Sequence, residues 1–164
     1  MIRIKNVLVA TDFSEPSAVA LEYGRELART YDATLHVIHI TEDLRWRFAA
    51  DGTPAFPAGA QEDFEAAART RLDAILNEED RTQLRARAVV NTAVNTPEAI
   101  VAYAKAEAID VIVMGTHGRS GFTHVLLGSV AERVVRLAPC PVLTVRHPEH
   151  EFIAPDALVL ASKV

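Results

Sequence analysis

Short aliphatic runs alternate with segments of helical spacing along most of this chain. Strand-like runs are predicted at residues 6–10, 33–40, 84–90, 109–114 and 141–146. Helices are predicted between them, from Ser14 to about Thr30, over the apolar positions Phe64 to Leu76, from Thr96, and from Ser129 to Leu137. The first run, Asn-Val-Leu-Val-Ala, has no polar alternation, which is typical of a strand covered on both faces. This alternation predicts an α/β fold whose parallel sheet has right-handed crossovers and helices on both faces.

Two departures from a regular pattern carry structural information. Residues 44–60 contain two glycines and two prolines and show no clean period, so we interpret them as a long loop of the kind that often serves as a lid. Arginines interrupt the run at 84–90, and prolines flank the run at 141–146. Both features favour strands at the edges of the sheet.

Length and charge limit the classes of partner. The chain has 164 residues, enough for one domain, and a formal net charge of −5. An acidic chain is poorly suited to binding nucleic acid or an anionic membrane surface. A single cysteine excludes an intrachain disulfide, and no apolar run is long enough to span a bilayer. Because the N-terminal residues lead directly into strand-like sequence, we expect a cytoplasmic protein with no nucleic-acid or membrane partner.

The most informative segment follows the fourth predicted strand. Four of the seven glycines of the chain fall within the 14 residues from Gly115 to Gly128. The pair Gly128-Ser129 then opens a helix, whose N-terminal N–H groups and dipole attract an anion. The Ser129 hydroxyl and the Arg119 guanidinium add donors. This layout predicts a phosphate site; the alternative is a glycine-rich loop with a structural role only.

The spacing Gly115-x2-Gly118-x9-Gly128-Ser129 resembles the nucleotide-binding motif of the universal stress protein family, in its ATP-binding subgroup. Residues 7–14, 110–118 and 140–145 are also similar to family sequences. The likeness covers residues 1–147, which we expect to form one universal stress protein domain, with residues 148–164 as a C-terminal extension that could serve as a dimer arm. The resemblance implies an open five-stranded parallel sheet in the order 3-2-1-4-5, Rossmann-like and similar to adenine nucleotide alpha hydrolases.

The resemblance also implies roles for individual residues around an adenine nucleotide. Asp12, at the end of the first strand, would accept a hydrogen bond from ribose or adenine; its alternative role is to cap the following helix. The remaining positions are the adenine side at Ala10, Thr11 and Ile40; the ribose border at Met114 and Gly115; the phosphate contacts at Gly118, Arg119, Gly128, Ser129 and Val130; and a further contact at His117. Mg²⁺ or Mn²⁺ would accompany the phosphates.

Three functions are compatible with this layout. The first is an ATP-binding protein that regulates a stress response and is not an enzyme. The second is a slow ATPase or a phosphotransferase that phosphorylates itself on Ser120, Thr123 or Ser129. It is disfavoured because the chain has no Walker lysine and no evident carboxylate pair for a metal. The third is a dimeric interaction module that binds no nucleotide, which the intact glycine motif argues against.

Several other residues have simpler interpretations. His36 and His39 lie three apart on one strand and therefore face opposite sides, which argues against a metal site. The aromatic residues Trp46, Phe48 and Phe56 either close over a base or pin their own loop. The acidic run at residues 78–80 is interpreted as a solvated helix end. The family resemblance implies a homodimer through the edge of the fifth strand, Val142 to Val145.

Overall fold

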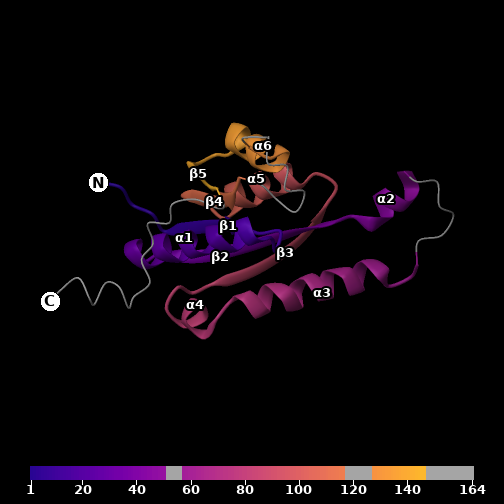
Figure 1. The fold of residues 1–164 in the computed structure, drawn as a ribbon, viewed down its shortest axis with the longest axis horizontal. Coiled ribbons are helices and arrows are strands. Elements are labelled where there is room, and N and C mark those ends of the chain that lie inside the picture. Colours follow the sequence, from indigo (N-terminus) through magenta and orange to yellow (C-terminus); the bar gives the residue numbers. More distant parts are fainter. Residues whose placement is uncertain (51–56, 117–126, 147–164) are drawn as a thin grey trace.

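The computed structural model describes residues 1–50, 57–116 and 127–146. Within these ranges strands and helices alternate, as the sequence predicts, and one additional short helix stands on each side of α3 (Figure 1). In chain order the elements are β1 (Asn6–Ala10), α1 (Glu15–Tyr31), β2 (Thr34–Glu42), α2 (Leu44–Ala50), α3 (Ala60–Ile75), α4 (Glu78–Thr82), β3 (Arg87–Ala93), α5 (Thr96–Ala106), β4 (Val111–Gly115), α6 (Ser129–Leu137) and β5 (Val142–Val145).

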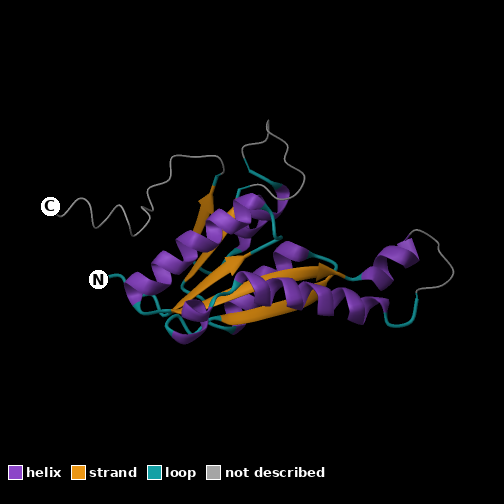
Figure 2. Ribbon diagram, turned by 60° about the horizontal axis from the view of Figure 1, so that its bottom comes forward, coloured by secondary structure: helices purple, strands orange, loops and turns teal. Residues whose placement is uncertain are grey.

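The five strands form one parallel sheet in the order β3-β2-β1-β4-β5 (Figure 2). This confirms the predicted order and the predicted edge positions of β3 and β5. β1 is the central strand, and its last residue, Ala10, pairs with Ile38 of β2 and Met114 of β4. The chain therefore reverses its direction across the sheet between β1 and β4, which is where open α/β sheets bind ligands.

Alternate residues of β1 supply the two halves of the core. Val7 and Val9 pack with residues of α1 and α3 on one face of the sheet. Leu8 and Ala10 pack with residues of α5 and α6 on the other face. Because both faces are covered, β1 is apolar throughout its buried length, as expected of a parallel strand.

The third strand begins three residues later than predicted. Leu84 is buried, and its carbonyl accepts a hydrogen bond from Leu35 N–H, but Arg85 takes a left-handed backbone conformation with φ of 51°. A residue with positive φ cannot continue a strand. The chain therefore turns at Arg85, and the regular ladder with β2 starts at Arg87.

The interpretation of residues 44–60 as one long loop was wrong in part. Leu44–Ala50 forms the short helix α2, which lies at the far right of Figure 1, away from the sheet. Residues 51–56 lie outside the described part of the chain. Helix α3 then begins at Ala60, directly after Gly59, whose φ is 81°. The prolines and glycines that conceal α2 in the sequence fall after it.

The interpretation of the acidic run 78–80 as solvated was wrong for its last residue. Asp80 is 1% exposed, although Glu78 and Glu79 are exposed. Its carboxylate accepts hydrogen bonds from Arg25 Nε at 2.8 Å and Arg25 Nη2 at 2.7 Å. It also completes a capping box with Asn77 at the start of α4. These donors compensate for the burial of the charge.

Candidate functional site

A cavity of about 490 Å³ lies at the carboxyl ends of β1, β2 and β4. Its size is in the range of small-molecule sites. Nine of the predicted site residues line it: Ala10, Thr11, Asp12, Ile40, Met114, Gly115, Gly128, Ser129 and Val130. The other three, His117, Gly118 and Arg119, lie outside the described residues. The fold thus brings together segments that are more than one hundred residues apart in the sequence.

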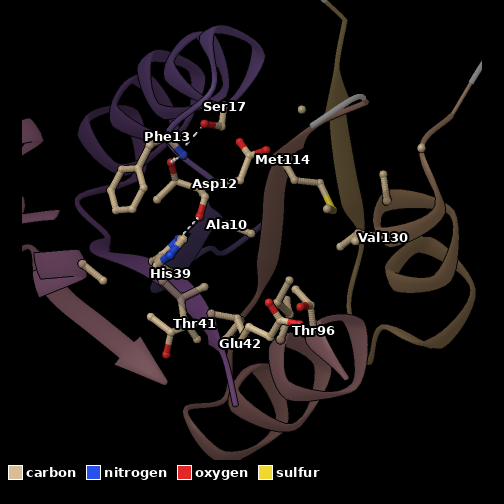
Figure 3. Close-up of a pocket in the computed structure, with 18 of the residues that line it drawn as sticks. Ala10, Asp12, Phe13, Ser17, His39, Thr41, Glu42, Thr96, Met114 and Val130 are labelled. Carbon is tan, nitrogen blue, oxygen red and sulfur yellow. Dashed lines mark hydrogen bonds between the residues drawn. The ribbon is translucent and has the colours of Figure 1, made fainter. Parts of the chain in front are cut away.

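Asp12 follows the carboxyl end of β1 and lines the cavity. In Figure 3, Met114 and Val130 lie on one side of it, and Phe13 and His39 lie on the other. Asp12 Oδ1 accepts a hydrogen bond from Ser14 N at 3.0 Å and another from the Ser14 hydroxyl. Ser14, not Asp12, is the N-cap residue of α1. Asp12 therefore orients the turn before the helix and also lines the cavity.

Thr11 is part of the cavity wall and forms four hydrogen bonds with neighbouring residues. Its N–H donates to Ile38 O at 2.9 Å, and its carbonyl lies 2.8 Å from His39 Nδ1, which acts as the donor. Its hydroxyl lies 3.0 Å from Ser17 Oγ and accepts from Phe13 N–H at 3.0 Å. Phe13 has φ of 64°, an unusual conformation for a bulky residue. The network holds this strained residue in place beside the cavity.

Gly115 is required for a different reason from the one the sequence indicates. A Cβ at this position would lie 3.0–3.2 Å from atoms of Pro16, in the first turn of α1. The missing side chain therefore lets β4 pack closely against the start of α1. Close approach of a ligand is not needed to explain this glycine.

The N-terminus of α6 opens onto the same cavity. Gly128 is the N-cap residue and makes no side-chain cap hydrogen bond, and Ser129 is exposed in the first turn. The N–H of Gly128 donates to Thr116 O at 2.7 Å, which anchors the cap to the end of β4. The N–H groups and the dipole of this helix favour an anion at this end of the cavity.

Sequence similarity identifies the family of this chain. A sequence model of the universal stress protein family matches residues 3–146. The chain belongs to this family. A universal stress protein of Methanocaldococcus jannaschii is 31% identical over 150 residues, which is 90% of this chain and 85% of the relative. A universal stress protein of Thermus aquaticus is 33% identical over 146 residues, covering 87% of this chain and 98% of the relative.

Solved structures of the universal stress protein family share the fold. A family member from Burkholderia pseudomallei is 27% identical with a TM-score of 0.66, and the likeness covers 87% of this chain and 96% of that one. The universal stress protein UspA from Lactobacillus plantarum has a TM-score of 0.68 at 24% identity, covering 89% and 100% of the two chains. The latter likeness concerns the fold alone.

The sequence did not reveal one wall of the cavity in this universal stress protein. Phe64, Ala67, Ala68 and Arg71 of α3 line the cavity opposite α6. Their contribution depends on how α3 packs, which follows from no local motif. Thr41 and Glu42, the last two residues of β2, and Thr96, which comes after β3, also line it. The rule that ligands bind at carboxyl ends of strands could have indicated these three.

A polar network holds α3 against the sheet. Gln61, 7% exposed, accepts a hydrogen bond from Leu44 N–H at 2.9 Å and donates to Glu65 Oε1 at 3.1 Å. The Thr92 hydroxyl also donates to Glu65 and lies 2.7 Å from the hydroxyl of Thr41. The hydrogen bonds from Thr92 and Gln61 lower the pKa of Glu65 below its ordinary value. The network links α3 to β2 and β3 at the cavity's edge.

The remaining expectations concern aromatic and metal-binding residues. Trp46 is 63% exposed on α2, and neither Trp46 nor Phe48 is part of the cavity wall; Phe56 lies outside the described residues.

His36 and His39 face opposite sides of the sheet, as predicted, with Nδ1 of His36 2.8 Å from Tyr103 Oη. In the described ranges no group of three or more His, Cys, Asp or Glu side chains is arranged to hold a metal ion. No helix within those ranges is long and apolar enough to cross a membrane.

Proposed function

We propose that this universal stress protein binds ATP, or another adenine nucleotide, in the cavity at the carboxyl ends of β1, β2 and β4. The observation that carries the proposal is that Asp12, just after β1, and the N-terminus of α6 line one and the same cavity. A carboxylate suits the hydroxyl and amine donors of a nucleoside, and a helix N-terminus suits phosphate.

The proposed roles follow the order of residues along the cavity. Ile40, at the end of β2, borders the base with Ala10 and Thr11. Met114 and Gly115 border the ribose, with Asp12 as its acceptor. Gly128, Ser129 and Val130 hold the phosphates, together with Gly118 and Arg119, and His117 makes a further contact; the last three lie outside the described residues. Two solved structures that share the fold are complexes of other universal stress proteins with cAMP and with dAMP, which supports an adenine nucleotide here.

A divalent ion would be held mainly by the nucleotide. Asp12 and Glu42 are the carboxylates of the described cavity wall, and they form no three-ligand cluster. Mg²⁺ or Mn²⁺ would therefore bind to phosphate oxygens, with the Ser129 hydroxyl as the nearest side-chain oxygen of the α6 N-terminus, and would neutralise phosphate charge.

The proposed activity is regulatory, with nucleotide occupancy as the signal. The sequence contains no Walker lysine, and Asp12 and Glu42 are the only carboxylates of the described cavity wall, which disfavours the alternatives of a slow ATPase or a self-phosphorylating protein. Accumulation of ADP or of phosphorylated protein in a long incubation with ATP would favour those alternatives. A dimeric module that binds no nucleotide is the third possibility, and a measurement of nucleotide binding distinguishes it from the first.

Mass spectrometry of nucleotides that co-purify with the protein, with calorimetric titration of ATP, ADP and AMP, tests the proposal. We expect Asp12→Ala to weaken adenine-nucleotide binding by about tenfold or more, as loss of a charge-assisted hydrogen bond implies. Ser14→Ala is the matched control, because it removes a hydrogen-bond partner of Asp12 and keeps the carboxylate. Absence of nucleotide binding by the wild-type protein would overturn the proposal.

A further inference from the structure

A second cavity, of about 480 Å³, lies between α1 and α3. Ala18 and Leu21 of α1 and Ala74 and Ile75 of α3 form its apolar walls. Thr11, Phe13, Ser17 and Arg71 line both this cavity and the one at the strand ends. The two cavities are therefore neighbours that share one wall, and every residue of the second wall lies in the described part of the chain.

Arg71 differs from most arginines of the described chain in having no ion pair. Arg25, Arg29, Arg81 and Arg85 each form an ion pair with a carboxylate. Arg71 forms none with any described residue; its guanidinium carbon lies 4.3 Å from the centroid of the Phe13 ring. An arginine that rests on an aromatic ring keeps its N–H donors available at the ring's edge and is held in one orientation.

The Phe13 side of this wall is rigid. The ring of Phe13 lies 4.4 Å from the ring of His39, between centroids, and its backbone is fixed in the left-handed region by the bond from its N–H to Thr11 Oγ1. Arg71 thus rests on a support that the folded chain has already ordered. Because the Arg71 side chain is already ordered, less conformational entropy is lost when an anion binds to it.

The charges of the second cavity favour an anion at Arg71. Its wall contains two arginines and one carboxylate, Glu22. Arg25 forms ion pairs with Glu22 and with the buried Asp80, so this arginine is already neutralised. Arg71 is left as the positive charge at the boundary with the first cavity, next to an apolar space. This combination fits a molecule with an apolar body and one anionic group.

We propose that the cavity between α1 and α3 is a second ligand site, which binds a small apolar or aromatic anion with its carboxylate or similar group on Arg71. The apolar body lies against Leu21, Ala74 and Ile75. Asp12 lines the first cavity and is not part of the wall of the second, and the second site does not require that a nucleotide binds in the first cavity. Because Thr11 and Phe13 line both cavities, a ligand in one contacts residues that also shape the other.

The test uses two fluorescent probes with the same aromatic body. Anilinonaphthalene sulfonate carries an anionic group, and phenylnaphthylamine is its neutral counterpart. We expect Arg71→Gln to weaken binding of the sulfonate by about tenfold and to leave binding of the neutral probe within about twofold. Arg69→Gln is the matched control, since it makes the same charge change on α3 at a residue that lines neither cavity. It should leave both affinities unchanged.

Two further measurements place the probe. Ala74→Trp, at an exposed position of α3, should fill the cavity and weaken both probes while the protein stays folded. ATP in excess should leave the sulfonate bound, because the first cavity is a separate space. Equal effects of Arg69→Gln and Arg71→Gln, full displacement by ATP, or absence of saturable binding would each overturn the proposal. The proposed nucleotide function would be unaffected by these outcomes.

Discussion

Gly24 lies in the middle of α1, where the absence of a side chain lets the helix approach β1. A Cβ at this position would overlap Cγ2 of Val9, which is fully buried. Helix propensity alone predicts that Gly24→Ala stabilises the protein by about 1 kcal/mol. The overlap reverses the sign, and we expect a net loss of about 2 kcal/mol in the free energy of unfolding. Urea denaturation measures it, with Thr30→Ala at an exposed site of the same helix as control.

His36 makes stability depend on pH. It is 1% exposed, its Nε2 has no hydrogen-bond partner among the described residues, and burial followed by the charge of Arg87 lowers its pKa below the ordinary value of 6.5. The unfolded chain therefore binds a proton at a pH where the folded chain does not. Stability is present above pH 6.5 and is lost as the pH falls toward the folded pKa.

Substitution of this histidine isolates its contribution. In His36→Phe the fall in unfolding free energy between pH 7.5 and pH 5.5, about one unit on each side of the ordinary pKa, should be smaller than in the wild-type protein. Tyr103→Phe removes the hydroxyl beside Nδ1 and keeps the buried imidazole, so the pH dependence should persist in that variant. Identical pH profiles for His36→Phe and the wild-type protein would contradict the assignment.

At the scale of elements, the short helix α4 is attached to α1 by the pair formed by Arg25 and Asp80. The side chains of these two residues are 12% and 2% exposed. Asp80→Ala leaves the largely buried Arg25 with only the exposed Glu22 as an ion-pair partner and removes the capping box of α4, so it should lower the free energy of unfolding by about 3 kcal/mol. Glu79→Ala breaks the neighbouring exposed pair with Arg29 and should cost less than about 1 kcal/mol. Denaturant unfolding of the two variants checks this difference, and equal losses would contradict it.

The contrast between these two pairs also shows what the sequence can predict. Runs of aliphatic residues predicted all five strands, and cap residues with helical spacing predicted helix α6, because these signals are local in the sequence. The burial of Asp80 was not predictable, because its partner Arg25 lies 55 residues away. The α3 wall of the cavity was missed for the same reason, since Phe64 and Arg71 reach the site only through tertiary packing. The backbone turn at Arg85 moved the start of β3, because a positive φ at a non-glycine residue leaves little trace in sequence.

At the scale of the whole molecule, the site follows from topology. Nine predicted residues converge because β1 and β4 are neighbours, an order that the family resemblance implies from the sequence. The structure changes the interpretation of one of them. Gly115 is needed for contact with Pro16, so a bulky substitution there would disturb packing as well as binding. The variants Asp12→Ala and Ser14→Ala therefore test nucleotide binding more directly than a substitution of Gly115 does.

The last prediction concerns the edge strand β5. Among the described strands only β4 pairs with it, and Leu143 on β5 and Val135 and Leu137 on α6 are 36%, 48% and 42% exposed. An aliphatic edge beside exposed apolar side chains favours pairing with a second copy of the chain. We expect the wild-type protein to sediment as a dimer at micromolar concentration and Leu143→Glu to sediment as a monomer. Val94→Glu places the same charge on an apolar residue that is 59% exposed outside β5 and α6, and it should stay dimeric. A monomeric wild-type protein, or dissociation of both variants alike, would exclude this edge as the interface.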